Sequence, residues 1–280
     1  WVNNPTYGDY WRKFKPVDEH YEDIEVASYS QAGWFDVFLQ GSLNNFIGMT
    51  TRARSEKARR NQKLIVGPWV HQLGARGTER TTGDVDFGPE VLFDLEEEEV
   101  RWMDHWLKGA DNGITDEPRV KLFVMGANEW RYADDWPLPE TRYTPHYIHS
   151  GGGANSLFGD GTLDRTEPAE EKPDRYVYDP DHPVMTIGGS TCCNTRGTPV
   201  SMGPRDQRPN EYRPDVLVYT TPPLEQDVEV TGPVKMVLYA ASSARDTDFV
   251  AKLVDVAPNE YAMNVAEGIL RARYRDSWDE

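Results

Sequence analysis

The chain has 280 residues, of which 38% are hydrophobic and 28% are charged, and its formal net charge at pH 7 is −17. This profile is typical of a folded protein with one large or two ordinary domains, and it argues against a disordered chain. The negative charge argues against nucleic acid or an anionic membrane surface as a partner, because phosphate groups are bound by basic patches. No apolar run reaches the roughly 18 residues that a membrane-spanning helix needs.

The first part of the chain predicts a strand and a helix on either side of an isolated acid. Residues 24–30 alternate apolar and polar side chains, which indicates a strand. We expect Gly33 and Trp34 to break this strand into a turn that carries Asp36. Across residues 37–60 the apolar side chains recur at three- and four-residue steps, which predicts one amphipathic helix.

A second strand, a second helix and a third strand follow in that order. Residues 63–69 form an apolar run that closes at Gly67, a pattern typical of a strand covered on both faces, and His71 comes just after it. The apolar stripe of residues 89–108 predicts a helix, and residues 120–126 predict a strand. Strands that alternate with helices predict a parallel sheet of the α/β class.

The character of the sequence changes beyond a boundary near residue 140. Residues 150–175 are rich in Gly, Pro and acidic residues and predict a long surface excursion or linker. Short runs of strand-forming residues then follow, separated by Pro and Asp. These runs are residues 174–180, 215–221, 228–242, 248–256 and 268–275. Several short strands with turn residues between them favour a β-sandwich or jelly roll.

The sequence contains no metal-binding motif and little cysteine. The six histidines are scattered, and neither HExxH nor CxxC occurs, so we expect no metal. The two cysteines, Cys192 and Cys193, are adjacent. Because neighbouring cysteines rarely bridge each other, we expect both to be small buried or loop residues.

Asp36 and His71 are the candidate catalytic residues. Each follows a predicted strand, and catalytic groups of parallel α/β sheets lie beyond the carboxyl ends of the strands. An acid followed by a histidine is the second half of the Ser, Asp, His chain order of α/β-hydrolases. From topology alone, the alternative remains that Asp36 is a turn or helix-cap residue and His71 a solvated loop residue.

A family resemblance rests on six segments of the sequence. They are GWFDVFLQGSLNNF, KLIVGPWVH, WMDHWLKGADNGI, EPRVKLFVMGANEWR, DDWPLP and DTDFVAKLVDV. These segments resemble the cocaine-esterase and Xaa-Pro dipeptidyl-peptidase family of serine hydrolases over nearly the whole chain. The resemblance implies an α/β-hydrolase domain with a helical cap, followed by a C-terminal jelly roll. It also implies that Asp36 is the acid and His71 the base of a Ser-Asp-His triad.

The resemblance implies that this chain is an internal fragment. Residues 1–140 would be the C-terminal portion of the α/β-hydrolase domain, with residues 1–20 the tail of the cap, and residues 141–280 a truncated, galactose-binding-like jelly roll. The family's nucleophile lies in an upstream Gly-x-Ser-Tyr-x-Gly elbow, and no Gly-x-Ser-x-Gly occurs here. Ser42 and Ser190, the nearest candidates, lack the second glycine. We therefore expect the chain alone to be inactive and fragile.

The resemblance implies hydrolysis of an ester or amide by the longer protein. The substrate would be a small-molecule ester, a small-molecule amide or a peptide, and no cofactor is implied. No signal peptide is visible, but we expect the true N-terminus to lie upstream, so localisation is left open. Family relatives often dimerise, and a homodimer also stays open.

The sequence also permits two other functions for the protein. One is a non-catalytic binding module made of an α/β region and a β-sandwich, and the other is a hydrolase that uses Asp36 as its nucleophile.

Two other groups of residues have a structural and a functional interpretation. Trp34 and Trp69 flank the acid and the base, so we expect core packing first and walls of an acyl pocket second. Asp246, Asp248 and Asp255 form an acidic cluster without the spaced ligands and glycine of a calcium loop. We expect turn and salt-bridge roles for these three acids.

Overall fold

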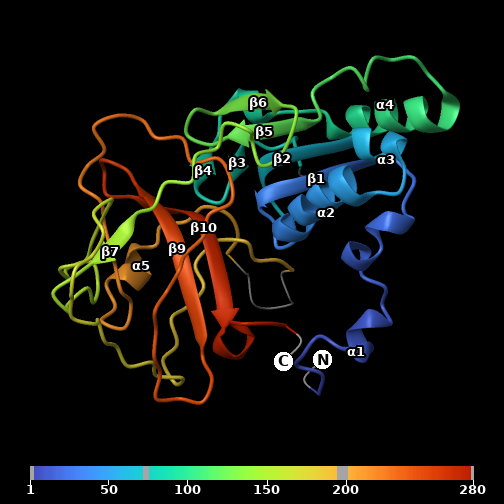
Figure 1. The fold of residues 1–280 in the computed structure, drawn as a ribbon. Coiled ribbons are helices and arrows are strands. Elements are labelled where there is room, and N and C mark those ends of the chain that lie inside the picture. Colours follow the sequence, from blue (N-terminus) through green and yellow to red (C-terminus); the bar gives the residue numbers. More distant parts are fainter. Residues whose placement is uncertain (1–2, 72–75, 194–200, 279–280) are drawn as a thin grey trace.

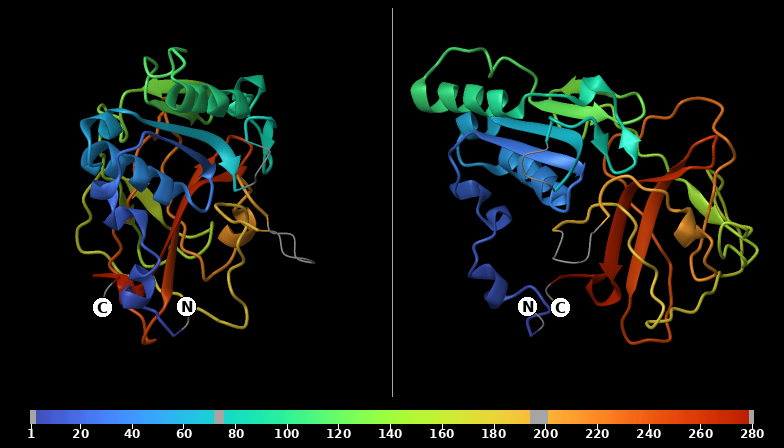
Figure 2. Two further views of the ribbon diagram at one scale, coloured as in Figure 1. Left: turned by 90° about the vertical axis from the view of Figure 1, so that its right-hand side faces the viewer. Right: turned by 180° about the vertical axis from the view of Figure 1, so that it is seen from behind.

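The computed structural model describes residues 3–71, 76–193 and 201–278, and its chain forms two regions (Figure 1). The first region is a sheet with helices on both faces, and the second is rich in loops and contains a long two-stranded ribbon (Figures 1 and 2). The segments near the two ends of the chain lie side by side, where the Tyr7 N–H donates to the Trp278 carbonyl at 2.7 Å. Of the described helices, none is long and apolar enough to cross a membrane.

The first region is built on a four-stranded sheet in the order β1-β2-β5-β6. Strand β1 is Ser28–Phe35, β2 is Gln62–Val70, β5 is Val120–Val124 and β6 is Glu129–Ala133. The pairs β1–β2 and β2–β5 are parallel, whereas β6 is an antiparallel edge strand. The parallel α/β arrangement expected from the strand and helix order is therefore confirmed.

Two helices cover opposite faces of this sheet (Figure 1). Helix α2 (Leu39–Arg52) packs Leu43 and Phe46 against the face that holds Leu64 and Val66 of β2. Helix α4 (Leu95–Lys108) packs on the other face, where its first residue contacts the alternate β2 side chains Ile65 and Trp69. Every residue of β2 except the last is buried, so the expectation of a strand covered on both faces is confirmed.

The strand ends differ from those that we expected. Strand β1 does not turn at Gly33 and Trp34 but continues to Phe35, and β2 continues through Gly67 to Val70. Gly33 lies opposite Gly67 in the parallel register. The lack of a side chain at Gly33 allows a close approach, because a Cβ there would lie 2.2 Å from the Trp69 carbonyl oxygen. The glycines thus permit tight strand pairing instead of ending the strands.

The helix ends also differ from the expected bounds. Helix α2 ends at Arg52, because Ala53 is extended (ψ 147°), and a separate helix α3 (Glu56–Arg60) starts at the Ser55 cap. The single helix expected over residues 37–60 was therefore wrong. Helix α4 starts at Leu95 rather than residue 89, since the Asp94 side chain accepts the Glu97 N–H at its first turn. The remaining short elements of the structure are α1 (Asp9–Arg12), η1 (Val17–Glu19), η2 (Tyr21–Asp23), β3 (Thr81–Thr82), β4 (Val85–Asp86), η3 (Pro89–Val91), α5 (Arg208–Glu211) and η4 (Ala272–Tyr274).

The second region contains fewer strands than the sequence pattern suggests. Strands β9 (Asp248–Val256) and β10 (Ala262–Arg271) pair antiparallel, and β7 (Tyr147–His149) pairs with β8 (Thr162–Asp164). The expected strand at residues 248–256 is therefore confirmed. Three other expected strands are not formed in the described structure, and they are residues 174–180, 215–221 and 228–242. Apolar side chains of residues 228–242 such as Tyr239 are exposed, because no strand covers or pairs with this segment in the described part of the chain.

The two adjacent cysteines are joined, contrary to our expectation. A disulfide connects Cys192 and Cys193. Side chains of consecutive residues alternate in an extended chain, so a bridge between neighbours requires a different backbone conformation. Cys193 adopts such a conformation, with a φ of 69°.

Candidate active site

Asp36 and His71 lie at the same edge of the sheet. Asp36 directly follows β1 and His71 directly follows β2, and the last paired residues of these parallel strands, Phe35 and Val70, lie opposite each other. The carboxyl ends of neighbouring parallel strands meet at one edge, which is where open α/β sheets place their ligands and catalytic groups. The two residues, which follow successive strands in the sequence, are therefore neighbours in space.

The histidine is hydrogen-bonded to the carboxylate through one ring nitrogen. His71 Nδ1 lies 3.1 Å from Asp36 Oδ1 and 3.2 Å from Asp36 Oδ2. Asp36 is 3% exposed, whereas the His71 side chain is 27% exposed. Within the described residues, Nε2 of His71 has no hydrogen-bond partner. A buried carboxylate on Nδ1 of a partly exposed histidine is what a general base of the triad type requires.

Among the described residues, two further donors hold the Asp36 carboxylate. The Phe38 N–H donates to Oδ1 at 2.8 Å, and the Arg76 guanidinium donates to Oδ2 through Nη2 at 2.9 Å. The Arg76 side chain is 16% exposed, so the ion pair is largely removed from water. Sequence reasoning missed Arg76, which lies in a loop 40 positions after Asp36. Its only signal was its charge, and it shares that charge with Arg80 in the segment that follows the candidate histidine.

An aromatic ring borders the histidine. The Phe38 ring packs edge-to-face on the His71 imidazole, with the ring centroids 4.9 Å apart. Phe38 is 61% exposed, so one side of the phenyl group faces solvent beside the histidine. An apolar group placed in this way can contact the apolar part of a molecule that approaches Nε2.

Trp34 and Trp69 are both packed into the first region. Trp69 is 3% exposed, and its ring lies 5.9 Å from that of Trp130. Trp34 donates its indole N–H to the Phe123 carbonyl at 2.8 Å and lies 6.1 Å from the Trp136 ring. These positions favour the packing role that we expected first for the two indoles.

The other candidate residues do not join the pair. No described serine is hydrogen-bonded to His71. Ser42 lies inside α2, and the Ser190 N–H donates to Glu267. In the second region Asp246 pairs with Arg273 and Asp248 pairs with Arg271, which confirms the expected salt-bridge role for these two acids.

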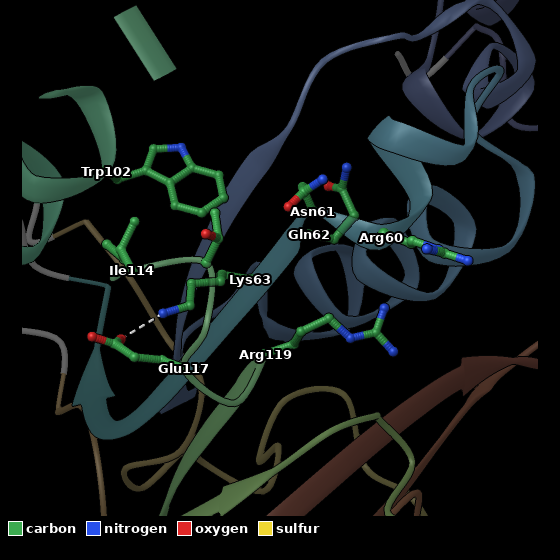
Figure 3. Close-up of a pocket in the computed structure, with 9 residues that line it drawn as sticks. Arg60, Asn61, Gln62, Lys63, Trp102, Ile114, Glu117 and Arg119 are labelled. Carbon is green, nitrogen blue, oxygen red and sulfur yellow. Dashed lines mark hydrogen bonds and ion pairs between the residues drawn. The ribbon is translucent and has the colours of Figure 1, made fainter. Parts of the chain in front are cut away.

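A pocket at the other end of β2 is a separate feature (Figure 3). Lys63 and Arg101 contact the two oxygens of Glu117 in this area, at 2.7 Å and 2.6 Å. Burial raises the pKa of Glu117, but the hydrogen bonds from Lys63 and Arg101 outweigh it and lower the pKa below its usual value. Lys63 lies eight strand positions before His71, a distance of about 26 Å at 3.3 Å per residue. This ion-pair cluster therefore does not belong to the Asp36–His71 site.

The fold and the site together define a mixed α/β protein with an acid–histidine pair at the carboxyl edge of its parallel strands. Sequence models of two families match the chain. The family described as X-Pro dipeptidyl-peptidase C-terminal non-catalytic domain matches residues 112–280, and the X-Pro dipeptidyl-peptidase (S15) family matches residues 1–73. The chain therefore belongs to the cocaine-esterase and Xaa-Pro dipeptidyl-peptidase family, as its sequence segments indicated.

Two relatives illustrate the similarity. The chain is 38% identical to cocaine esterase from Rhodococcus sp. (strain MB1 Bresler) over 280 residues, which is 99% of this chain and 46% of that protein. Its structure is similar to the crystal structure of an aminopeptidase from the marine sediment archaeon Thaumarchaeota archaeon. The TM-score is 0.74 and the identity 26%, and the match covers 100% of this chain and 46% of that one. The chain thus spans about half the length of these relatives.

Proposed function

We propose that the protein carrying this chain is a serine hydrolase of acyl esters or amides. In this proposal a serine outside the present chain attacks the substrate carbonyl, and Nε2 of His71 takes its proton. Asp36 keeps the histidine in the correct tautomer and stabilises the imidazolium. A water molecule that His71 deprotonates then hydrolyses the acyl-enzyme.

The observation that carries this proposal is the hydrogen bond between Asp36 and Nδ1 of His71. The bond joins a 3% exposed acid to a histidine that is partly open to solvent, and both residues follow adjacent parallel strands. A turn acid or a solvated loop histidine needs no such partner. The membership of the family and the similarity to an esterase and an aminopeptidase support the same chemistry.

The proposal extends to the domains and to the substrate. Residues 1–140 would be the C-terminal portion of an α/β-hydrolase domain, with residues 1–20 from a cap, and residues 141–280 part of a jelly roll. Without its serine, this chain alone would be inactive. The substrate would be a small ester, an amide or a peptide, and the exposed Phe38 ring beside His71 would contact its acyl group.

Pre-steady-state kinetics of the full-length protein would test the proposal. With p-nitrophenyl butyrate, an acyl-enzyme mechanism gives a burst of p-nitrophenol equal to the enzyme concentration, provided that deacylation is the slow step. The chain alone, assayed in parallel, should give no burst. Absence of any esterase or amidase activity in the full-length protein would instead favour the non-catalytic binding module.

A further inference from the structure

In the described part of the chain, the Asp36 carboxylate accepts a hydrogen bond from one donor on each oxygen besides His71. The Phe38 N–H occupies Oδ1 and the Arg76 guanidinium occupies Oδ2, at 2.8 Å and 2.9 Å. His71 Nδ1 lies almost equally far from both oxygens, at 3.1 Å and 3.2 Å. Rotation of the carboxylate would break one of the two outer bonds, so these bonds define the orientation that the histidine meets.

Arg76 is the charged member of this arrangement. Asp36 is 3% exposed, and an isolated buried carboxylate is costly unless a cation or several hydrogen bonds compensate it. The Phe38 N–H belongs to the backbone and will remain in any side-chain variant. Of these two donors to Asp36, only the Arg76 side chain can therefore be removed by substitution.

We infer that Arg76 is a positioning residue of the catalytic pair, which holds the Asp36 carboxylate in its productive orientation. This inference rests on the proposed function, because it assigns Arg76 a role through the triad acid. Arg76 acts on Asp36 and not on the substrate, so its loss should lower kcat and leave KM unchanged. A hydrogen bond to a charged group corresponds to a change of about 10- to 100-fold in rate, and we expect a loss of kcat in this range.

The test uses variants of the full-length enzyme with p-nitrophenyl butyrate as substrate. Arg76→Gln should lose kcat as stated, and Arg76→Lys should keep much of it, because the ammonium can still donate to the carboxylate. Methylguanidine at millimolar concentration should restore part of the activity of Arg76→Ala. Arg80→Gln is the matched control, since Arg80 is 50% exposed and pairs with Asp86 in the same connecting segment. Its kcat should equal that of the parent.

The possible results distinguish a failure of the Arg76 inference from a failure of the proposed function. A parental kcat in Arg76→Gln overturns the inference, and so does a loss that neither lysine nor methylguanidine repairs, which would indicate general misfolding. Asp36→Asn is assayed beside these variants. If Asp36→Asn is inactive while Arg76→Gln is fully active, the triad stands and only the role of Arg76 fails. If Asp36→Asn keeps parental activity, the proposed function and the inference fail together. Thermal melting identifies a Gln variant that does not fold, in which case Arg76→Lys decides.

Discussion

Titratable side chains of the first region are stabilised in contrasting ways. His71 has a buried carboxylate on one ring nitrogen, and its side chain is partly exposed. Lys121 on β5 lies among aromatic rings, with Nζ 3.4 Å from the Phe93 centroid and 4.9 Å from the Trp130 centroid. Burial lowers the pKa of Lys121 to about 8, although Glu98 and Glu117 oppose the shift. Desolvation therefore outweighs the attraction of the two carboxylates for the ammonium group.

Replacement of Lys121 should change how stability depends on pH. The pKa of lysine in an unfolded chain is about 10.4, so between about pH 8 and pH 10.4 the unfolded state binds more protons than the folded state. The free energy of unfolding of the parent should therefore gain a contribution that rises with pH in this window. Lys121→Met should lack that rise and be more stable at pH 7, as urea unfolding at several pH values would measure. Lys108→Met is the control, because Lys108 is 73% exposed, and an equal change in that variant would contradict the explanation.

Single residues of the site were only partly predictable from the sequence. Asp36 and His71 could be found because the positions after consecutive parallel strands share one edge. Arg76 could not, since its position follows no periodicity and depends on how a loop folds back on the sheet. The bridge between Cys192 and Cys193 was missed for a similar reason, because it depends on a left-handed backbone at one residue.

The pairing of β1 and β2 brings Asp36 and His71 together, and it depends on glycine. A Cβ on Gly33 would lie 2.2 Å from the backbone oxygen of Trp69, which cannot move independently of β2. We expect Gly33→Ala to force the strands apart and to lower the free energy of unfolding by about 1–3 kcal/mol. Urea denaturation measures this change. Gly41→Ala in α2 is the control, because nothing lies within 4 Å of its Cβ position, and it should stabilise the helix. Equal effects of both substitutions would contradict the close-approach explanation.

In the hairpin of β7 and β8, a histidine forms ion pairs with two acidic side chains. His149 Nδ1 lies 2.7 Å from Glu171, and Nε2 lies 3.3 Å from Asp164. The hydrogen bond with Glu171 raises the pKa of His149, although burial opposes the shift. A raised pKa in the folded state means that the stabilisation is complete below the unfolded pKa of about 6.5 and is lost as the pH rises through the folded value.

Removal of Glu171 should therefore matter most in mildly acidic solution. The Tm of Glu171→Gln should fall below that of the parent near about pH 6, where His149 is charged, and the difference should shrink in alkaline solution. Thermal melting of both proteins across this range measures the trend. Asp179→Asn is a control, since Asp179 pairs with the 80% exposed His182 elsewhere in the chain. A difference for Glu171→Gln that grows with pH would show that the ion pair is not the cause.

Elements were predictable where local pattern and tertiary packing agree. The apolar run of β2 formed as expected, because both faces of the strand are covered. Helix α4 formed from Leu95 onward, but of its expected apolar stripe only Leu95 and Trp102 are buried. The runs at residues 215–221 and 228–242 did not form strands, although their composition favours them. The strand preference of a residue reflects its packing against neighbouring strands. A segment of such residues therefore forms a strand only where neighbouring strands are present.

At the scale of the whole molecule, the second region holds the loop that carries Arg76. This loop continues into β3 and β4, where the Asp84 N–H donates to the Pro204 carbonyl at 3.0 Å. Asp84 also pairs with Arg205 and accepts a hydrogen bond from the Tyr261 hydroxyl at 3.4 Å. Residues 76–86 thereby contact both the sheet, through Arg76, and the second region, through Asp84. The order of the two regions was predictable from composition, whereas this contact joins residues too distant in sequence to be inferred.

The most direct test of the account is the kcat/KM of histidine and aspartate variants of the full-length protein toward p-nitrophenyl butyrate. If the proposed triad is correct, we predict a loss of about 10⁶-fold for His71→Ala and about 10⁴-fold for Asp36→Asn, the losses seen in Ser-Asp-His enzymes. His105→Ala is the matched control, because His105 lies on α4 with its Nδ1 2.9 Å from the Ala110 carbonyl oxygen, and it should keep parental activity. Parental kcat/KM in both His71→Ala and Asp36→Asn would contradict the account and reduce the pair to a structural contact.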